Sequence, residues 1–228
     1  MLSDGSQTQA DFTAAMARRE DWARTYAFNF LPLGYVDQTR LPSTLQTATI
    51  EAAATSRSVA GHLNKYLLEE FDLIGKWVTA FDDAVSRALA LMPSSIFVEI
   101  VRFLGLCSAG QSIRNLMTPN DIRQCKDRIG TREFDFVLNK SPLIAPQKIL
   151  PDTGISIVDL TNDNLMASGA AIVGCAMTSE PNALKSRLAL KLPKDITLDA
   201  DGITLSGPVA SGLVKRVIRE VAPQWHSA

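Results

Sequence analysis

Hydrophobic residues recur at intervals of three and four along most of the chain, a spacing typical of helices that bury one face. The cleanest stripe lies in residues 81–92, and Pro93 follows it at a position where a helix ends. Similar stripes occur in residues 61–74 and 209–221. The pattern therefore predicts a mainly α-helical fold.

Residues 96–117 form an apolar run in the middle of the chain, and we predict that they are the spine of a helical core. Large apolar side chains fall on one helical face of this run, namely Phe97, Ile100, Val101 and Leu104. Gly110 lacks a Cβ, so it would either let a second helix approach closely or mark a bend between two helices.

The segment Leu165–Met177 is rich in alanine and glycine, and small residues at helical spacing allow a helix to be buried nearly all round. We therefore predict a central buried helix there. Residues 184–192 are ambiguous between helix and strand. Residues 195–206 contain two β-type runs joined around Asp201-Gly202, which predicts a small β-hairpin.

The chain has 228 residues, enough for one large domain or two small ones. We expect a disordered tail over residues 1–10, a single compact helical domain over residues 11–222 and a C-terminal tail over residues 223–228. Prolines and a glycine make residues 139–154 a candidate subdomain boundary within that domain.

Composition narrows the range of functions. The chain has 23 basic and 24 acidic residues, so its net charge predicts no general attraction to nucleic acid or to an anionic membrane. Its cysteines are three in number and widely spaced, which favours buried reduced thiols over a zinc site or a disulfide framework. The N-terminus shows no secretory signal, and the weakly polar run Leu165–Met177 is too short to span a bilayer. We therefore expect a soluble cytoplasmic protein without direct membrane insertion.

The stretch from Gly105 to Ser112 has the glycine spacing of a phosphate-binding loop. Gln111, however, occupies the lysine position of that motif and supplies no charge for phosphates. A nucleotide-binding enzyme that uses this loop is the alternative to the helical spine. No other catalytic motif is present, so we predict a protein that is not an enzyme and has no catalytic residues, cofactor or metal.

Two sets of residues are candidates for binding a partner protein. The first lies in an aromatic segment, residues 26–36, and consists of Phe28, Phe30 and Tyr35. These rings either pin the segment to a core or form an exposed docking peptide. The second set is basic and consists of Arg114, Lys215, Arg216 and Arg219. Its last three members share one face of the helix predicted near the C-terminus, which is either solvated or bound to an acidic partner.

Several of these stretches resemble, in order, the type III secretion K protein family (SctK, including the YscK and PscK types). Leu104-Gly105, with a second glycine and Ile113-Arg114 after it, looks like the family's central signature. Residues 28–35, followed by Arg40-Leu41-Pro42, resemble its aromatic-proline-tyrosine segment. Further matches cover residues 136–144, 168–170 and 185–193, so that the resemblance extends over about residues 26–220.

The resemblance implies a mainly helical, non-catalytic adaptor of the injectisome sorting platform. In that family the K protein links the cytoplasmic domain of the inner-membrane ring protein, SctD, to the SctQ pod. We therefore expect these two proteins as partners, and a position at the cytoplasmic face of the inner membrane. A secretion chaperone is a further alternative, but such chaperones are usually small and acidic, and this chain is neither.

Overall fold

The computed structural model describes residues 19–45, 47–145, 160–200 and 204–225. Within these residues the chain is mainly α-helical, which confirms the predicted fold class. The chain divides into two compact units. Unit 1 comprises Met1–Val36 and Leu41–Ala80, and unit 2 comprises Asp37–Arg40 and Phe81–Ala228. The predicted tail at residues 1–10 and most of the predicted boundary at 139–154 lie outside the described residues.

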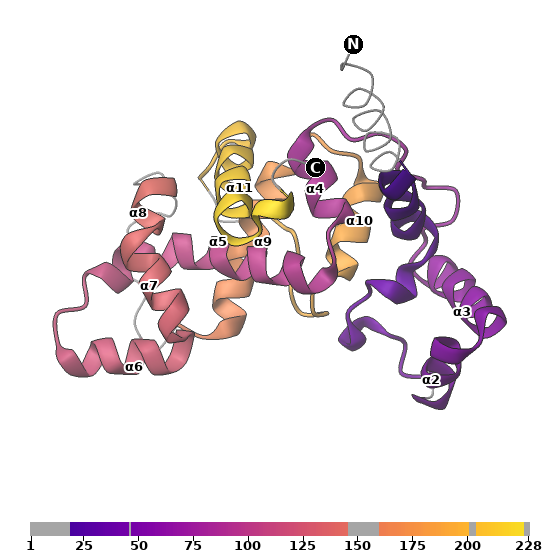
Figure 1. The fold of residues 1–228 in the computed structure, drawn as a ribbon, viewed down its shortest axis with the longest axis horizontal. Helices are drawn as coiled ribbons and strands as arrows, with labels where there is room; N and C mark the ends of the chain where they lie inside the picture. Colours follow the sequence, from indigo (N-terminus) through magenta and orange to yellow (C-terminus); the bar gives the residue numbers. More distant parts are fainter. Residues whose placement is uncertain (1–18, 46, 146–159, 201–203, 226–228) are drawn as a thin grey trace, which may run out of the picture. The chain divides into compact units, whose positions relative to one another are not determined.

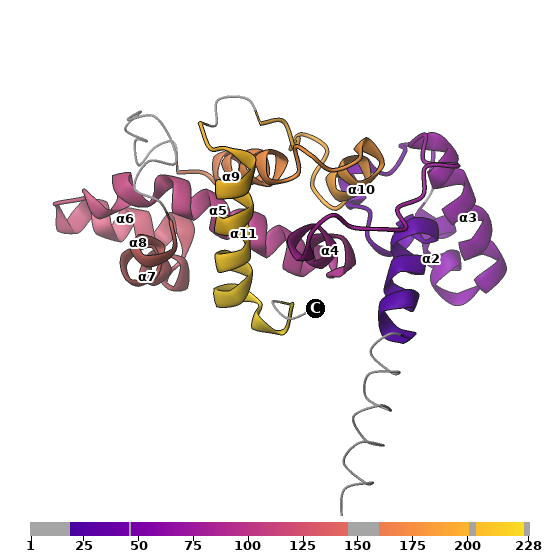
Figure 2. The same ribbon diagram turned by 90° about the horizontal axis from the view of Figure 1, so that it is seen from above.

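Unit 2 is built on three helices, α5 (Ser94–Arg114), α9 (Asn162–Ala176) and α11 (Gly207–Val221). Figure 1 shows α5 as one continuous helix with α11 lying across it, and Figure 2 shows the same packing from a second direction. Helices α5 and α9 are buried on almost every side, and their wholly buried side chains include Phe97, Leu104, Ile172 and Val173. The predictions of a helical spine and of a central buried helix are thus both confirmed.

Two glycines bring α5 and α9 into direct backbone contact. A Cβ added to Gly105 would overlap the main-chain carbonyl of Leu165, and one added to Gly169 would overlap that of Val101. No side chain separates the two helices at these points, so they approach more closely than packed side chains would allow. The sequence pointed to Gly110 as the site of close approach, whereas Gly105 holds that position against α9.

Shorter helices complete unit 2. They are α4 (Ala84–Leu91), α6 (Pro119–Ile129), α7 (Thr131–Asn139), α8 (Ser141–Ile144) and α10 (Asn182–Leu190). Asp83 caps the start of α4 with a capping box. Its carboxylate accepts a hydrogen bond from the Ser86 amide, and the Ser86 hydroxyl oxygen accepts one from the Asp83 amide. Residues 182–190 are helical, which settles the ambiguity in that segment. The short 3-10 helix η4 (Pro223–Trp225) follows α11 and buries Trp225.

The predicted hairpin near residues 195–206 is not supported. Residues 195–200 and 204–206 contain no strand, and the turn at residues 201–203 lies outside the described residues. The segment packs on α9 instead, because the carbonyl of Leu198 lies against Gly174, where a Cβ would overlap it. Ile196 is buried in the same segment. The main chain of this segment therefore lies against α9, and its described residues form no strand.

Unit 1 contains a helical segment at residues 19–30, the 3-10 helix η1 (Pro32–Gly34), α2 (Thr47–Thr55) and α3 (Arg57–Glu70). Its small core centres on Ala53, Leu63 and Leu67. The helix at residues 19–30 includes the first half of the aromatic segment. It ends at residue 30 because Pro32 starts a tighter 3-10 turn.

Buried amide and hydroxyl groups hold unit 1 together. The side chain of Asn29 pairs with the backbone of Val78 through two hydrogen bonds of 2.8 Å, donating one and accepting the other. The Tyr35 hydroxyl donates to the carbonyl of Phe28 at 3.0 Å. Each bond satisfies a polar group that burial has removed from water, so the unit depends on these bonds as well as on apolar packing.

Residues 37–40 belong to unit 2 and are fixed to the end of α10. The Arg40 guanidinium donates to the carbonyls of Leu192, Pro193 and Ile196 at 2.6, 3.0 and 2.8 Å. Beside them, Lys191 is fully buried, and its ammonium donates to three carbonyls at the end of α4, those of Leu89, Ala90 and Met92. The ammonium thus caps a helix C-terminus, where positive charge is favourable.

The contact between α5 and α9 at Gly169 predicts that adding one methyl group there greatly lowers the free energy of unfolding. Gly169→Ala should lower the free energy of unfolding by more than about 3 kcal/mol, because the new Cβ would meet backbone rather than a movable side chain. Urea denaturation measures this. Gly212→Ala in α11 is the matched control, since no atom lies within 4 Å of its added Cβ, and helix propensity should raise stability by about 0.5–1 kcal/mol. Equal effects of the two substitutions would contradict the backbone contact.

The buried ammonium predicts a pH dependence of stability. Burial lowers the pKa of Lys191 from 10.5 to about 7. Between these values the unfolded chain binds more protons than the folded one, so stability gains as pH rises. From pH 7 to pH 9, wild type should gain on the order of 2 kcal/mol relative to Lys191→Met, measured by urea denaturation at each pH. Parallel curves for the two proteins would contradict a lowered pKa.

Candidate partner-binding surfaces

The aromatic residues predicted to bind a partner occupy two different environments. Phe28 is 3% exposed, and the ring of Tyr35 stacks on it with centroids 5.6 Å apart. Both rings belong to the interior of unit 1, as the alternative of a pinned segment describes. Phe30 is only partly buried. A partner contact by these three residues stays a prediction, and Phe30 is the one whose ring reaches the surface.

Phe30 is part of an exposed row of four rings, which we call the aromatic ladder: Trp22, Tyr26, Phe30 and Trp77. Successive ring centroids lie 5.7, 4.9 and 4.7 Å apart. Trp22 is 70% exposed, Tyr26 45% and Trp77 42%. A contiguous row of exposed aromatic side chains is a candidate binding surface, because such rings dominate the energy of protein interfaces.

Sequence reasoning missed the aromatic ladder, although a signal was present. Trp22, Tyr26 and Phe30 follow one another at intervals of four, which places them on one face of a helix. The aromatic segment recognised from the sequence spans residues 26–36, which leaves Trp22 outside it. Trp77 joins the row through the tertiary fold, and periodicity along the chain carries no signal for it.

The basic candidate residues lie on unit 2. Lys215 and Arg219 are exposed on α11, and Arg216 and Arg114 are partly buried. The charges of Arg114 on α5 and Arg216 on α11 both act on one buried thiol, that of Cys107. Burial raises the pKa of Cys107 to about 12, and the charges of Arg114 and Arg216 oppose that rise. The thiol is therefore protonated and inert, and the three cysteines are buried and free, as predicted.

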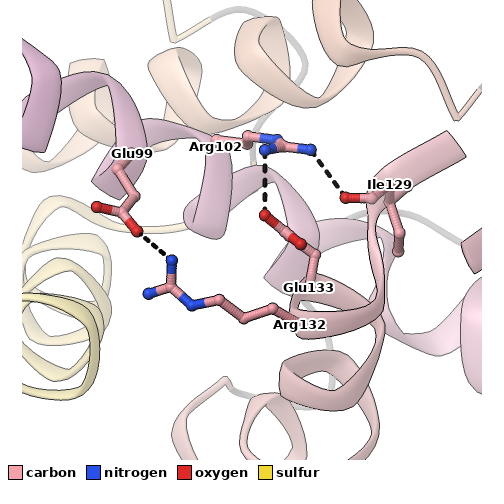
Figure 3. A network of polar contacts seen from close by, with 5 residues as sticks. All are labelled: Glu99, Arg102, Ile129, Arg132 and Glu133. Atoms are coloured by element: carbon pink, nitrogen blue, oxygen red, sulfur yellow. Dashed lines mark hydrogen bonds and ion pairs between the residues drawn. The ribbon is translucent and has the colours of Figure 1, made fainter.

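Other charged residues of α5 are engaged in ion pairs with α7. Figure 3 shows Arg102 donating to the Glu133 carboxylate at 3.1 Å and to the carbonyl of Ile129 at 2.8 Å. In the same view Arg132 donates to Glu99 at 2.7 Å. These opposite charges neutralise each other across the helix pair. The network therefore fixes α7 on α5 and contributes little net charge to the surface.

The alternative of a phosphate-binding loop is inconsistent with the structure. Gly105 and Gly110 both lie inside the continuous helix α5, and both are buried. Backbone amides within a helix already donate to carbonyls four residues earlier, so they are not available to a phosphate. The stretch Gly105–Ser112 is thus a packing element.

A family model described as "YOP proteins translocation protein K (YscK)" matches residues 23–227, which is most of the chain. The chain belongs to the YscK family. Two relatives named Yop proteins translocation protein K, from Yersinia pseudotuberculosis serotype I and Yersinia enterocolitica, are each 26% identical to it over 212 residues. These residues cover 90% of this chain and 96% of each relative. No solved structure matches the chain at a significant level.

Membership in the YscK family confirms the resemblance to type III secretion K proteins that the sequence motifs carried. Among the described residues, α5 is the one helix of this family member that is long and apolar enough to cross a membrane. However, 61% of its apolar stretch is buried inside the protein, as in the core helix of a globular unit.

The exposure of the aromatic ladder predicts how the tryptophans respond to a fluorescence quencher. The three tryptophans are Trp22, Trp77 and Trp225, of which Trp225 is 8% exposed. Trp22→Phe should lower the Stern–Volmer constant for acrylamide, because it removes the most accessible indole. Trp225→Phe should raise that constant, because it removes a shielded one. The opposite order would contradict the exposed position of Trp22.

Proposed function

We propose that this chain is a non-catalytic adaptor of the type III secretion injectisome, which links the cytoplasmic domain of the SctD-type ring protein to the SctQ-type pod of the sorting platform. It acts at the cytoplasmic face of the inner membrane, held there by its partners. Family membership supports a role in protein secretion. The names of the two Yersinia relatives support a role in Yop translocation.

The observation that carries the bridging role is the presence of two chemically different exposed surfaces on two separate units. Unit 1 carries the aromatic ladder, which suits a contact dominated by apolar burial. Unit 2 carries the basic residues of α11 and Arg114, which suit an acidic contact. A protein that connects two others needs two such surfaces that do not compete for the same partner.

Two other roles fit less well. A nucleotide-dependent enzyme would need a phosphate-binding loop, and the proposed stretch is a buried helix. A secretion chaperone has no specific support, because the chain has nearly balanced charge.

The adaptor role predicts a ternary complex. The full chain, the SctD-type cytoplasmic domain and the SctQ-type protein from the same genome should elute together in size exclusion with light scattering. The two partners alone should not bind each other. If the chain binds neither partner at about 10 µM, near the weak end of transient interfaces, the adaptor role is wrong.

A surface variant tests whether the aromatic ladder takes part in this complex. Trp22→Ala combined with Tyr26→Ala should weaken one of the two partners by about tenfold or more, because aromatic anchors dominate interface energy. Tyr66→Ala is the matched control, since Tyr66 is also a partly exposed aromatic residue of unit 1 but lies on α3, outside the aromatic ladder. Unchanged affinity for both partners would remove the aromatic ladder from the interface.

A further inference from the structure

The guanidinium of Arg114 is held in a fixed place at the junction of α5, α7 and α8. Its Nη2 donates to Gln111 Oε1 at 3.0 Å, and its Nη1 lies 3.4 Å from the Ser141 hydroxyl and 3.5 Å from the Val137 carbonyl. All three acceptors are neutral. The positive charge of Arg114 is therefore positioned by these contacts but is not neutralised by them.

Gly110 makes room for this arrangement. A Cβ at Gly110 would lie 2.7 Å from the Ser141 oxygen and 3.0 Å from Nη1 of Arg114. The absence of a side chain lets the arginine fold back along its own helix toward Ser141. Gly110 thus leaves room for the side chain of Arg114, whereas Gly105 lets α5 pack closely against α9.

Arg216 supplies a second cation next to the first. Its Nε donates to the carbonyl of Gly212 at 3.1 Å, which holds the side chain along the surface of α11. Its charge and that of Arg114 both act on the buried thiol of Cys107 on α5. Helix α11 packs against both α5, which carries Arg114, and α8, which carries its partner Ser141. The Lys140–Glu220 ion pair joins the start of α8 to α11 one turn beyond Arg216, so the two arginines lie in the same part of unit 2, and both residues are partly exposed.

No carboxylate of the described residues forms an ion pair with either arginine. Glu220, one turn beyond Arg216, pairs with Lys140 at 2.8 Å. Lys215 and Arg219 add further positive charge on the exposed side of the same helix. This part of the surface is consequently basic, although the whole chain carries a net charge of only −1.

We propose that Arg114 and Arg216 form an arginine clamp that binds carboxylates of an acidic segment on a partner protein. A guanidinium presents a planar fork of N–H donors that matches a carboxylate, and donors held in advance lose less conformational freedom on binding. Because the surface is basic, the side chains that it binds are aspartates and glutamates. Lys215 and Arg219 contact the flanking residues of the same acidic segment. This inference rests on the proposed adaptor function and adds the chemistry of one of its two contacts.

Binding of the full chain to a labelled deca-glutamate peptide and to each platform protein tests the arginine clamp. Arg114→Gln combined with Arg216→Gln should weaken the peptide and one platform protein by about tenfold or more, because each arginine contributes a charge-assisted contact. Arg123→Gln, at an exposed arginine of α6, should change either affinity by less than about twofold, because isolated surface charges contribute little. Raising the salt from about 50 to 300 mM should weaken wild type more than the double variant.

The outcomes separate this inference from the adaptor function. If wild type binds a platform protein and the double variant binds it equally well, the arginine clamp is wrong and the adaptor function stands. If wild type binds the peptide through the arginines but neither platform protein, the adaptor function fails and the clamp stands. Arginine-dependent binding to vesicles containing phosphatidylglycerol, without binding to the peptide, would overturn the choice of a protein carboxylate.

A folding control keeps the test decisive. The melting temperature of the double variant shows whether its structure survives. If it does not, Arg114→Lys combined with Arg216→Lys retains both charges but removes the planar fork. That variant should bind the peptide more weakly than wild type and keep most of its salt dependence. If this lysine variant binds the peptide with wild-type affinity, the bidentate clamp is wrong.

Discussion

The backbone contact between α5 and α9 is the constraint on which the rest of unit 2 depends. Gly105 and Gly169 let the two helices meet without intervening side chains, so their separation is set by main-chain atoms. Helix α11 packs against both. The same contact therefore sets the position of the basic residues of α11 relative to Arg114 on α5. The placement of these surface charges thus depends on two buried glycines.

The stretches that resemble the K protein family hold several of the buried polar groups. Asn29 and Tyr35 close the aromatic segment of unit 1 onto its own backbone. Arg40 and Lys191 donate, between them, to six main-chain carbonyls of unit 2. Each of these side chains saturates backbone groups that burial would otherwise leave without partners. The shared motifs thus describe a scaffold.

Periodicity predicted the helices well where one face is apolar, as in α3, α4 and α11. It could not tell which glycine of α5 meets a neighbour, because a helix buried on nearly all sides has no single apolar face. The hairpin prediction failed because the segment packs its main chain on a helix, where the carbonyl of Leu198 lies against Gly174. Alternation of apolar residues does not distinguish that arrangement from a strand pair. Trp77 could not be assigned to the aromatic ladder in advance, because it reaches Phe30 from a distant part of the chain.

The two candidate surfaces differ in the physical force on which each relies. Contacts of the aromatic ladder gain free energy from apolar burial, which screening by salt leaves largely unchanged. Contacts of the basic surface gain it from interactions between charges, which salt screens beyond a Debye length of about 10 Å at 0.1 M ionic strength. An acidic segment gains little from exposed rings, and an apolar groove would have to desolvate arginines to bind the basic surface. In the adaptor function that we propose, surfaces of this kind discriminate between the two partners by chemistry, so that neither partner occupies both surfaces.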